Sequence, residues 1–180
     1  MLMDKKNSLL LVIDVQERLA PTVSETREVI NNSKKLIEIA QILKIPYIYT
    51  EQYPKGLGET IFDIKSVANK EACSKIEFSC AKNSDILKSI KACKKQQIII
   101  TGVETHICVL QTAMDLKAKG FDVFVVSDAT SSRENLEHVF ALHRLAKNEI
   151  DVVTFEMVVF EWLEKAGTEE FKIISKKYIR

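Results

Sequence analysis

Short apolar segments alternate with longer amphipathic segments along this chain. Five of the short segments are aliphatic or β-branched and are bounded by turn or charged residues, a pattern typical of buried strands. They span residues 8–14, 46–51, 97–103, 122–128 and 151–155, and a shorter sixth segment spans 75–79. Their length and composition predict six strands.

Helical patterns fill the gaps between the predicted strands. They cover about 24–43, 83–94, 105–119 and 134–147, with a further stretch from about residue 156. Strands and helices that alternate in this way form right-handed β-α-β units. No repeat, low-complexity tract or linker interrupts them. We therefore predict one three-layer α/β/α domain over residues 1–180, with a six-stranded, mainly parallel sheet in the order 3-2-1-4-5-6.

Composition narrows the classes of function. The 180 residues are 46% hydrophobic and 28% charged, as in soluble globular proteins, and their net charge is only +1. Such a balance provides no general field to attract nucleic acid or an anionic membrane. The apolar run near the N-terminus is too short to span a bilayer and lacks a signal-peptide cleavage site. We expect a cytoplasmic protein with free thiols at Cys73, Cys80, Cys93 and Cys108.

Two strand ends carry candidate chemistry, because sites in open parallel sheets lie at the carboxyl ends of the strands. Asp14 ends the first strand, where a carboxylate either caps the next turn or acts as a general base. Cys108 follows the strand 97–103 and falls in the first turn of a helix. Free N–H groups and the helix dipole lower the pKa of a thiol there and can hold an oxyanion. A buried structural cysteine explains the same position.

The predicted strand order brings these two candidates together. Strands one and four are neighbours in it, so Asp14 and Cys108 would lie about one strand spacing apart, roughly 5 Å. A nucleophile beside a base is the arrangement that covalent catalysis needs. A cation would complete the site, and Lys70, Lys75 and Lys82 are all candidates.

Motifs along nearly the whole chain resemble those of the isochorismatase-like cysteine hydrolases, which include nicotinamidases and carbamoyl-amide hydrolases. The matching stretches are LLLVIDVQERLAPTV, TEQYPKGLG, KIEFS, TGVETHICVLQTAMDL and VVSDATSSR. The resemblance implies a catalytic triad of Asp14, Lys75 and Cys108, with Gln16 as the glutamine of the D-x-Q motif. It also implies homo-oligomers, dimers or larger.

The resemblance further implies a cis peptide bond between Val103 and Glu104. The N–H groups of Glu104 and Cys108 would then form an oxyanion hole. The implied activity is hydrolysis of a small amide or related C–N bond through a Cys108 thioester, with Asp14 as the base. Gln16, Tyr53 and His106 are the expected substrate-binding residues, although His106 also suits a subunit contact.

At two places this sequence differs from the family's motifs, and these differences limit which properties of the family can be expected here. Nicotinamidases bind a metal through a D-x-H motif after the second strand, whereas this chain has TEQYPKGLGET there and no histidine. We therefore expect no metal and no other cofactor. Ala81 also replaces an aromatic residue that relatives often carry, a gap that Tyr53 could fill. Two alternatives stay open: a vinyl-ether hydrolase, in which the cysteine is dispensable, and a non-catalytic scaffold or binding protein on the same fold.

Overall fold

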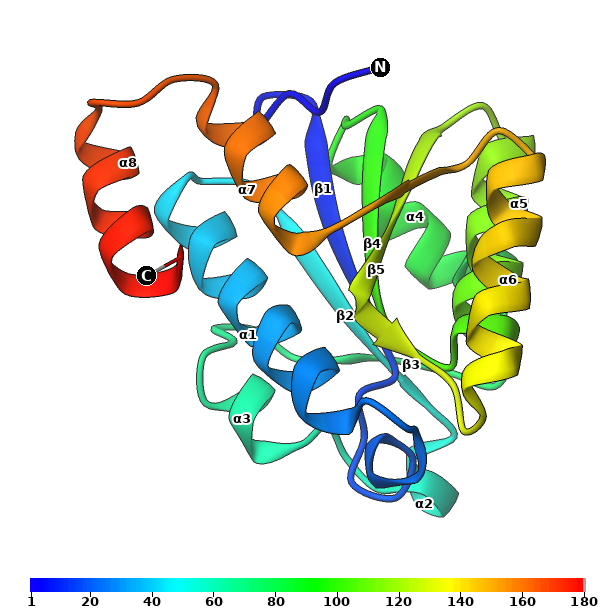
Figure 1. Ribbon diagram of the computed structural model, residues 1–180. Coiled ribbons are helices and arrows are strands. Elements are labelled where there is room, and N and C mark those ends of the chain that lie inside the picture. Colours follow the sequence, from blue (N-terminus) through cyan, green and yellow to red (C-terminus); the bar gives the residue numbers. More distant parts are fainter. Residues whose placement is uncertain (180) are drawn as a thin grey trace.

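A six-stranded parallel sheet lies at the centre of the computed structural model, which describes residues 1–179 (Figure 1). The strand order is β3-β2-β1-β4-β5-β6, and every ladder between these strands is parallel. The predicted class and strand order are therefore confirmed. The strands are β1 Ser8–Ile13, β2 Tyr47–Gln52, β3 Cys73–Lys75, β4 Gln97–Val103, β5 Asp122–Ser131 and β6 Asp151–Val153.

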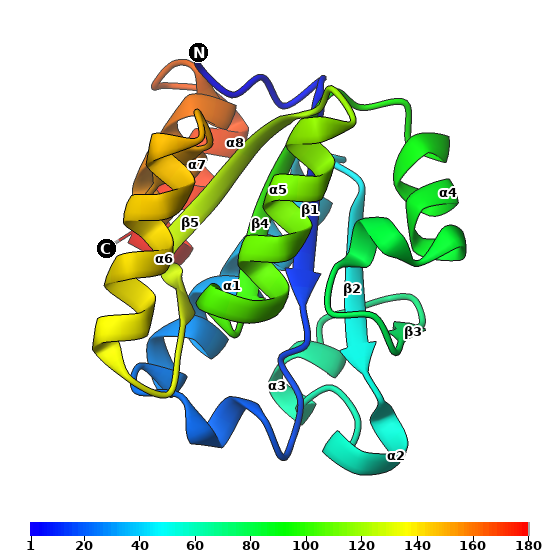
Figure 2. The same ribbon diagram turned by 90° about the vertical axis from the view of Figure 1, so that its right-hand side faces the viewer.

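Helices cover both faces of the sheet (Figures 1 and 2). One layer consists of α4 Ser84–Ala92, α5 Leu110–Ala118 and α6 Asn135–Lys147. The other consists of α1 Thr26–Ile42, α7 Phe155–Leu163 and α8 Glu169–Ile174. Short elements complete the fold: α2 Pro54–Leu57, α3 Phe62–Lys65, 3₁₀ turns at Ala20–Thr22 and Cys80–Lys82, and π-helical turns at Thr105–Val109 and Ser175–Ile179.

The strands divide the hydrophobic core into two parts. In β1, Leu9, Leu11 and Ile13 pack in the cluster beneath α4, α5 and α6, whereas Leu10 and Val12 pack in the cluster beneath α1 and α7. A strand buried on both faces has no polar side for solvent, which explains its continuous apolar sequence. The polar residues that follow it consequently lie at the carboxyl edge of the sheet.

The third strand lies earlier in the chain than the sequence predicts. The prediction was 75–79, but β3 spans Cys73–Lys75, so Lys75 ends the strand instead of beginning it. After Lys75 the chain leaves the sheet, and the side chains of Ile76 and Phe78 are 78% and 54% exposed. Their apolar character suggested a buried strand, whereas they lie on the surface beside the sheet edge.

Other boundaries also differ from expectation. The helix predicted over 105–119 begins as the π-helical turn Thr105–Val109 and becomes α-helical only from Leu110. Strand β5 runs on to Ser131, because its final residues pair with the end of β4 after a shift in register. No helix among residues 1–179 has the length and apolar character needed to cross a membrane.

Candidate active site

The three predicted triad residues converge at the carboxyl edge of the sheet. Asp14 directly follows β1 and holds a left-handed backbone conformation with φ of 53°. Lys75 ends β3 and Cys108 lies in the π-helical turn after β4. All three side chains are buried. Strand pairing therefore joins residues that are far apart in the chain.

All three N–H donors of the Lys75 ammonium group are bonded to acceptors within the protein. Its Nζ donates to Asp14 Oδ2 at 2.6 Å, to Gln52 Oε1 at 2.6 Å and to the Phe78 carbonyl at 3.2 Å. Burial acts to lower the pKa of Lys75, but the Asp14 carboxylate and nearby thiols raise it on balance. An ammonium group has three N–H donors, so Lys75 has none left for a substrate. It serves as a fixed positive charge.

The Asp14 carboxylate is held by donors on both oxygens. Oδ2 accepts from Lys75, and Oδ1 accepts from the Thr50 hydroxyl at 2.7 Å. Burial raises the pKa of Asp14, while the charge and hydrogen bond of Lys75 and the bonds from Thr50 and Cys108 oppose that rise. A buried carboxylate with a raised pKa is suited to accept a proton.

The Cys108 thiol lies close enough to Asp14 for each group to shift the pKa of the other. Burial and the Asp14 charge raise the pKa of Cys108, against the opposing charge of Lys75. The lowered pKa expected from the helix start is therefore wrong for this thiol. Desolvation and a neighbouring anion outweigh the helix dipole at this position. A thiol whose pKa is raised in this way needs a base to activate it.

A second buried thiol, Cys80, also lies at this site and was not singled out from the sequence. Burial and the Asp14 charge raise the pKa of Cys80 to about 12. Its backbone N–H donates to the Thr112 hydroxyl oxygen at 3.0 Å. Because Cys80 and Cys108 share the same charged neighbours, Cys80 is a natural internal control for the reactivity of Cys108.

Two glutamines support the triad from behind. The Gln16 amide nitrogen donates to the carbonyls of Gln52 and Gly58 at 3.0 and 2.7 Å, and its oxygen accepts from the Gln52 N–H at 2.7 Å. These bonds fix the end of β2, whose Gln52 side chain accepts from Lys75. Both N–H donors of the buried Gln16 amide are used, so its predicted substrate contact stays a prediction and the geometry favours a positioning role.

Thr50 and Gln52 were also not singled out from the sequence. They are polar residues two apart at the end of β2, with Glu51 between them. The available signal was this spacing, since residues two apart on a strand share one face.

The turn that carries Cys108 is joined to the segment after β5. The bond between Val103 and Glu104 is cis, at the position that the motif implies. The Glu104 carbonyl accepts from the N–H groups of Ile107 and Val109 at 3.1 and 3.2 Å. Its buried carboxylate accepts from Arg133 Nε at 3.0 Å. Arg133 therefore ties the segment after β5 to the nucleophile's turn.

Tyr53 lines a cavity of about 410 Å³ beside Lys75. Exposed residues form most of its wall, and Tyr53 is itself an exposed side chain at the start of α2. The other lining residues are Pro54, Lys55, Ser74, Ile76, Glu77 and Asn83. The role of Tyr53 in substrate binding stays a prediction, and its place beside Lys75 suits that role.

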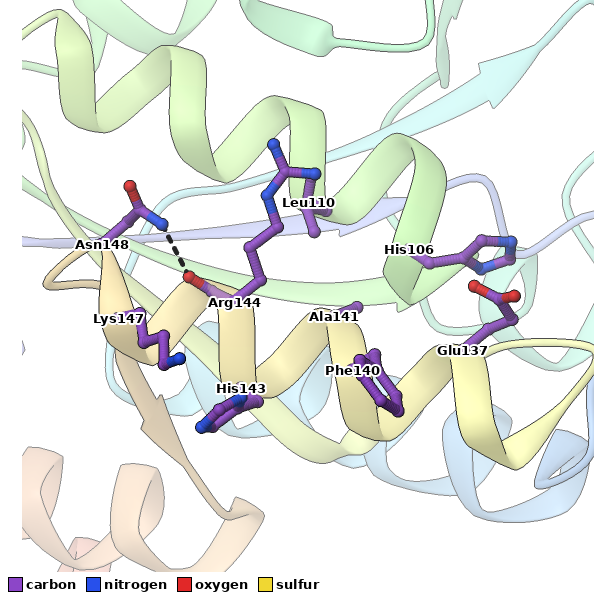
Figure 3. A pocket seen from close by; sticks show the side chains of 9 residues that line it. All are labelled: His106, Leu110, Glu137, Phe140, Ala141, His143, Arg144, Lys147 and Asn148. Atoms are coloured by element: carbon purple, nitrogen blue, oxygen red, sulfur yellow. Dashed lines mark hydrogen bonds between the residues drawn. The ribbon is translucent and has the colours of Figure 1, made fainter.

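His106 lies elsewhere, on a groove between α5 and α6 (Figure 3). Its Nδ1 is 2.9 Å from Ser132 Oγ. The cavity beside Lys75 is not lined by His106. Of the two roles left open for His106, its position favours the subunit contact.

Within residues 1–179 no group of three or more His, Cys, Asp or Glu side chains is arranged to hold a metal ion. His138 Nδ1 lies 2.9 Å from the Thr105 hydroxyl, whereas His143 lines the groove along α6. The expectation of a metal-free site therefore stays a prediction, now with no candidate ligand set among these residues.

The isochorismatase domain model matches residues 8–157 of this chain. The chain belongs to the isochorismatase family. The family is one of hydrolases on a shared α/β fold, which agrees with the strand order and the edge at which the polar residues gather.

Three solved structures resemble this isochorismatase-family chain over nearly its whole length. MAR1 ribonuclease from Caenorhabditis elegans is 35% identical, with a TM-score of 0.93 over 100% of this chain and 93% of that one. The YcaC gene product from Escherichia coli, described as an octameric hydrolase of unknown specificity, is 26% identical, with a TM-score of 0.92 and coverage of 99% and 91%. YcaC from Pseudomonas aeruginosa, solved with hexane-2,5-diol and covalent acrylamide, is 27% identical, with a TM-score of 0.90 and coverage of 97% and 90%.

Proposed function

We propose that this protein is a metal-independent hydrolase of a small amide or related C–N bond, with Cys108 as the nucleophile. The observation that carries the proposal is that Cys108 is buried at the same sheet edge as Asp14, whose carboxylate accepts hydrogen bonds from Lys75 and Thr50. A thiol with a raised pKa needs a base in direct contact, and Asp14 is that base.

In the proposed first step, Asp14 takes the proton of the Cys108 thiol as the sulfur attacks the substrate carbonyl. The new C–S bond converts the carbonyl oxygen to an oxyanion. When the C–N bond breaks, the proton held by Asp14 passes to the leaving nitrogen, and a thioester remains. Lys75 has no free N–H for this transfer, so its contribution is to stabilise negative charge as it moves between Asp14 and sulfur.

In the second step water attacks the thioester, with Asp14 accepting a proton from the water. The C–S bond breaks, the proton returns to sulfur, and a carboxylic acid is released. The N–H groups of Glu104 and Cys108 are the proposed oxyanion donors. The Glu104 carbonyl accepts from the N–H groups of Ile107 and Val109 on either side of the Cys108 N–H. Two such donors are worth several kcal/mol in acyl transfer, about 3 kcal/mol for each one removed.

Two relatives bear on the type of reaction. The Pseudomonas protein was solved with covalent acrylamide, which nucleophiles attack at its alkene, and this supports a reactive nucleophile in this fold. The Caenorhabditis protein is named a ribonuclease. In this chain Lys75, the cation of the triad, is buried and its three N–H donors are bonded to protein acceptors, so Lys75 is not available to bind an RNA phosphate. The octameric Escherichia protein supports the expected homo-oligomer.

The nucleophile can be tested without knowing the substrate. Native protein is treated with iodoacetamide, and the modification of each cysteine is followed by mass spectrometry. We expect Cys108 to react at least about tenfold faster than Cys80, since a nucleophilic thiol must be open to reagents and its structural neighbour need not be. Cys73 and Cys93, both half-buried, report general accessibility. Equal or slower labelling of Cys108 relative to Cys80 would contradict the proposal.

The reaction class is then tested with a panel of small amides, imides and carbamates, a vinyl ether and an RNA oligonucleotide. Turnover of a C–N substrate that falls by about 10³-fold or more in Cys108→Ala supports the proposal. Vinyl-ether or RNA cleavage that survives Cys108→Ala would replace it. Absence of all turnover, together with an unreactive Cys108, would indicate a binding protein.

A further inference from the structure

Helix α6 presents apolar side chains on its outer surface as well as toward the core. Ala141 and Leu145 are buried beneath the helix. On the outer side Leu136, Val139 and Phe140 are 66%, 51% and 65% exposed. Their spacing of three and four residues places them on one face of the helix. These three residues, called here the outer stripe, form an exposed apolar surface that nothing among residues 1–179 covers.

Charged residues flank the outer stripe in a polarised order. Glu134 and Glu137 lie near the start of α6, and Arg144 and Lys147 lie near its end. None of these four side chains forms an ion pair with another residue of the chain over positions 1–179. Glu137 and Arg144 project from the same side of the helix, toward α5, whereas Phe140 projects away from it (Figure 3).

We propose that α6 packs antiparallel against α6 of a second copy of this chain, about a two-fold axis beside Phe140. A two-fold axis perpendicular to antiparallel helices brings the same flank of each helix together. Glu137 then faces Arg144 of the partner subunit, and the reciprocal pair forms at the other end. The midpoint of this pair along the helix lies between Phe140 and Ala141, so the same register lets the outer stripes cover each other.

This surface adjoins the turn that carries Cys108. His106 lines the groove together with Glu137 and Arg144, and it is hydrogen-bonded to Ser132. A second copy seated on α6 would thus cover the groove that holds His106 and support the nucleophile's turn from outside. The inference does not depend on which bond the site hydrolyses.

The test is a charge exchange on the full-length chain, with mass measured by native mass spectrometry and by light scattering after gel filtration. In Glu137→Arg, and separately in Arg144→Glu, each symmetric interface gains two like-charge contacts. We expect the dissociation constant of this interface to rise on the order of a hundredfold. Combining the two changes in one chain should restore assembly. Mixing the two single variants should also restore it, as mixed dimers, because opposite charges then meet at both ends.

Controls separate this interface from general effects of charge or stability. Lys91→Glu reverses an exposed charge on α4 and should leave the mass unchanged. Circular dichroism of each variant checks that α6 still forms, since the same charges also favour the helix dipole. Three outcomes would overturn the proposal: a wild-type chain that is monomeric at tens of micromolar, single variants with the wild-type mass, or a failure of both the double variant and the mixture to reassemble.

Discussion

At the scale of single residues, the chemistry depends on the opposite effects of the Asp14 and Lys75 charges on the Cys108 thiol. Asp14 raises the pKa of Cys108 and Lys75 lowers it, after the larger effect of burial. Asp14 is also the proposed base. Its negative charge therefore disfavours ionisation of Cys108, although the carboxylate is needed for turnover. Substitutions can separate these two effects.

Asp14→Asn removes the anion beside Cys108 and leaves the Lys75 cation in place. The pKa of Cys108 should therefore fall, and its alkylation by iodoacetamide should begin at a lower pH than in the wild type. Turnover should nevertheless fall by 10³-fold or more, because no base remains to carry the proton to the leaving nitrogen. The pH dependence of alkylation, followed at Cys108 by mass spectrometry, checks the direction.

Lys75→Met is the matched opposite change and should raise the pH at which Cys108 is alkylated. In the wild type, turnover should decrease on the acid side as Asp14 takes up a proton. The midpoint of that decrease should lie above 3.8, since burial raises the pKa of Asp14. An alkylation profile unchanged in both variants would show that the three groups are not coupled.

At the scale of elements, the site depends on how closely β4 approaches β1. Gly102 has a φ of 109°, and a Cβ there would lie 2.0 Å from the backbone oxygen of Ile13. No side chain fits this contact without displacing one of the strands. The glycine therefore sets the spacing between the strand that leads to Asp14 and the strand that leads to Cys108.

Gly102→Ala should lower the free energy of unfolding by about 4 kcal/mol or more, or prevent folding. Gly120→Ala is the matched control. Gly120 also has a positive φ, of 88°, but an added Cβ there meets nothing within 4 Å. Gly120→Ala should therefore lower the free energy of unfolding only by the penalty for a positive φ at a residue with a side chain, roughly 1–2 kcal/mol. Urea denaturation measures both variants, and similar losses would show that φ, not the contact with β1, limits residue 102.

At the scale of the whole molecule, the triad places an ion pair inside the core. The Lys75 and Asp14 side chains are fully buried, with nitrogen and oxygen 2.6 Å apart. Desolvation of such a pair opposes its attraction, so the pair itself contributes little to stability, whereas loss of one partner leaves an uncompensated charge.

Lys75→Met alone should therefore lower the free energy of unfolding by about 3–5 kcal/mol. Adding Asp14→Asn removes the stranded charge, and we expect the double variant to recover a substantial part of that loss while remaining inactive. Urea denaturation of both single variants and the double variant gives the coupling energy. Additive losses would show that the two groups do not act as a pair.

The sequence by itself determined the fold class, the strand order and the positions of Asp14, Lys75 and Cys108. The apolar runs can be recognised in the sequence, and sites in parallel sheets generally lie at the carboxyl ends of the strands. The family motifs indicated Lys75 among the three candidate lysines. The sequence misplaced the third strand, because Ile76 and Phe78 are apolar but exposed.

Only the tertiary structure decided the electrostatics and the surfaces. The helix-start argument predicted a lowered pKa for Cys108, whereas burial beside Asp14 raises it. The direction of this pKa shift depends on desolvation and on the distance between Cys108 and Asp14, which are far apart in the chain. The spacing of residues along the sequence gives neither quantity. The same holds for Gln52, which meets Lys75 through the pairing of β2 with β3, and for the outer stripe of α6, whose exposure depends on how the helix is turned against the sheet.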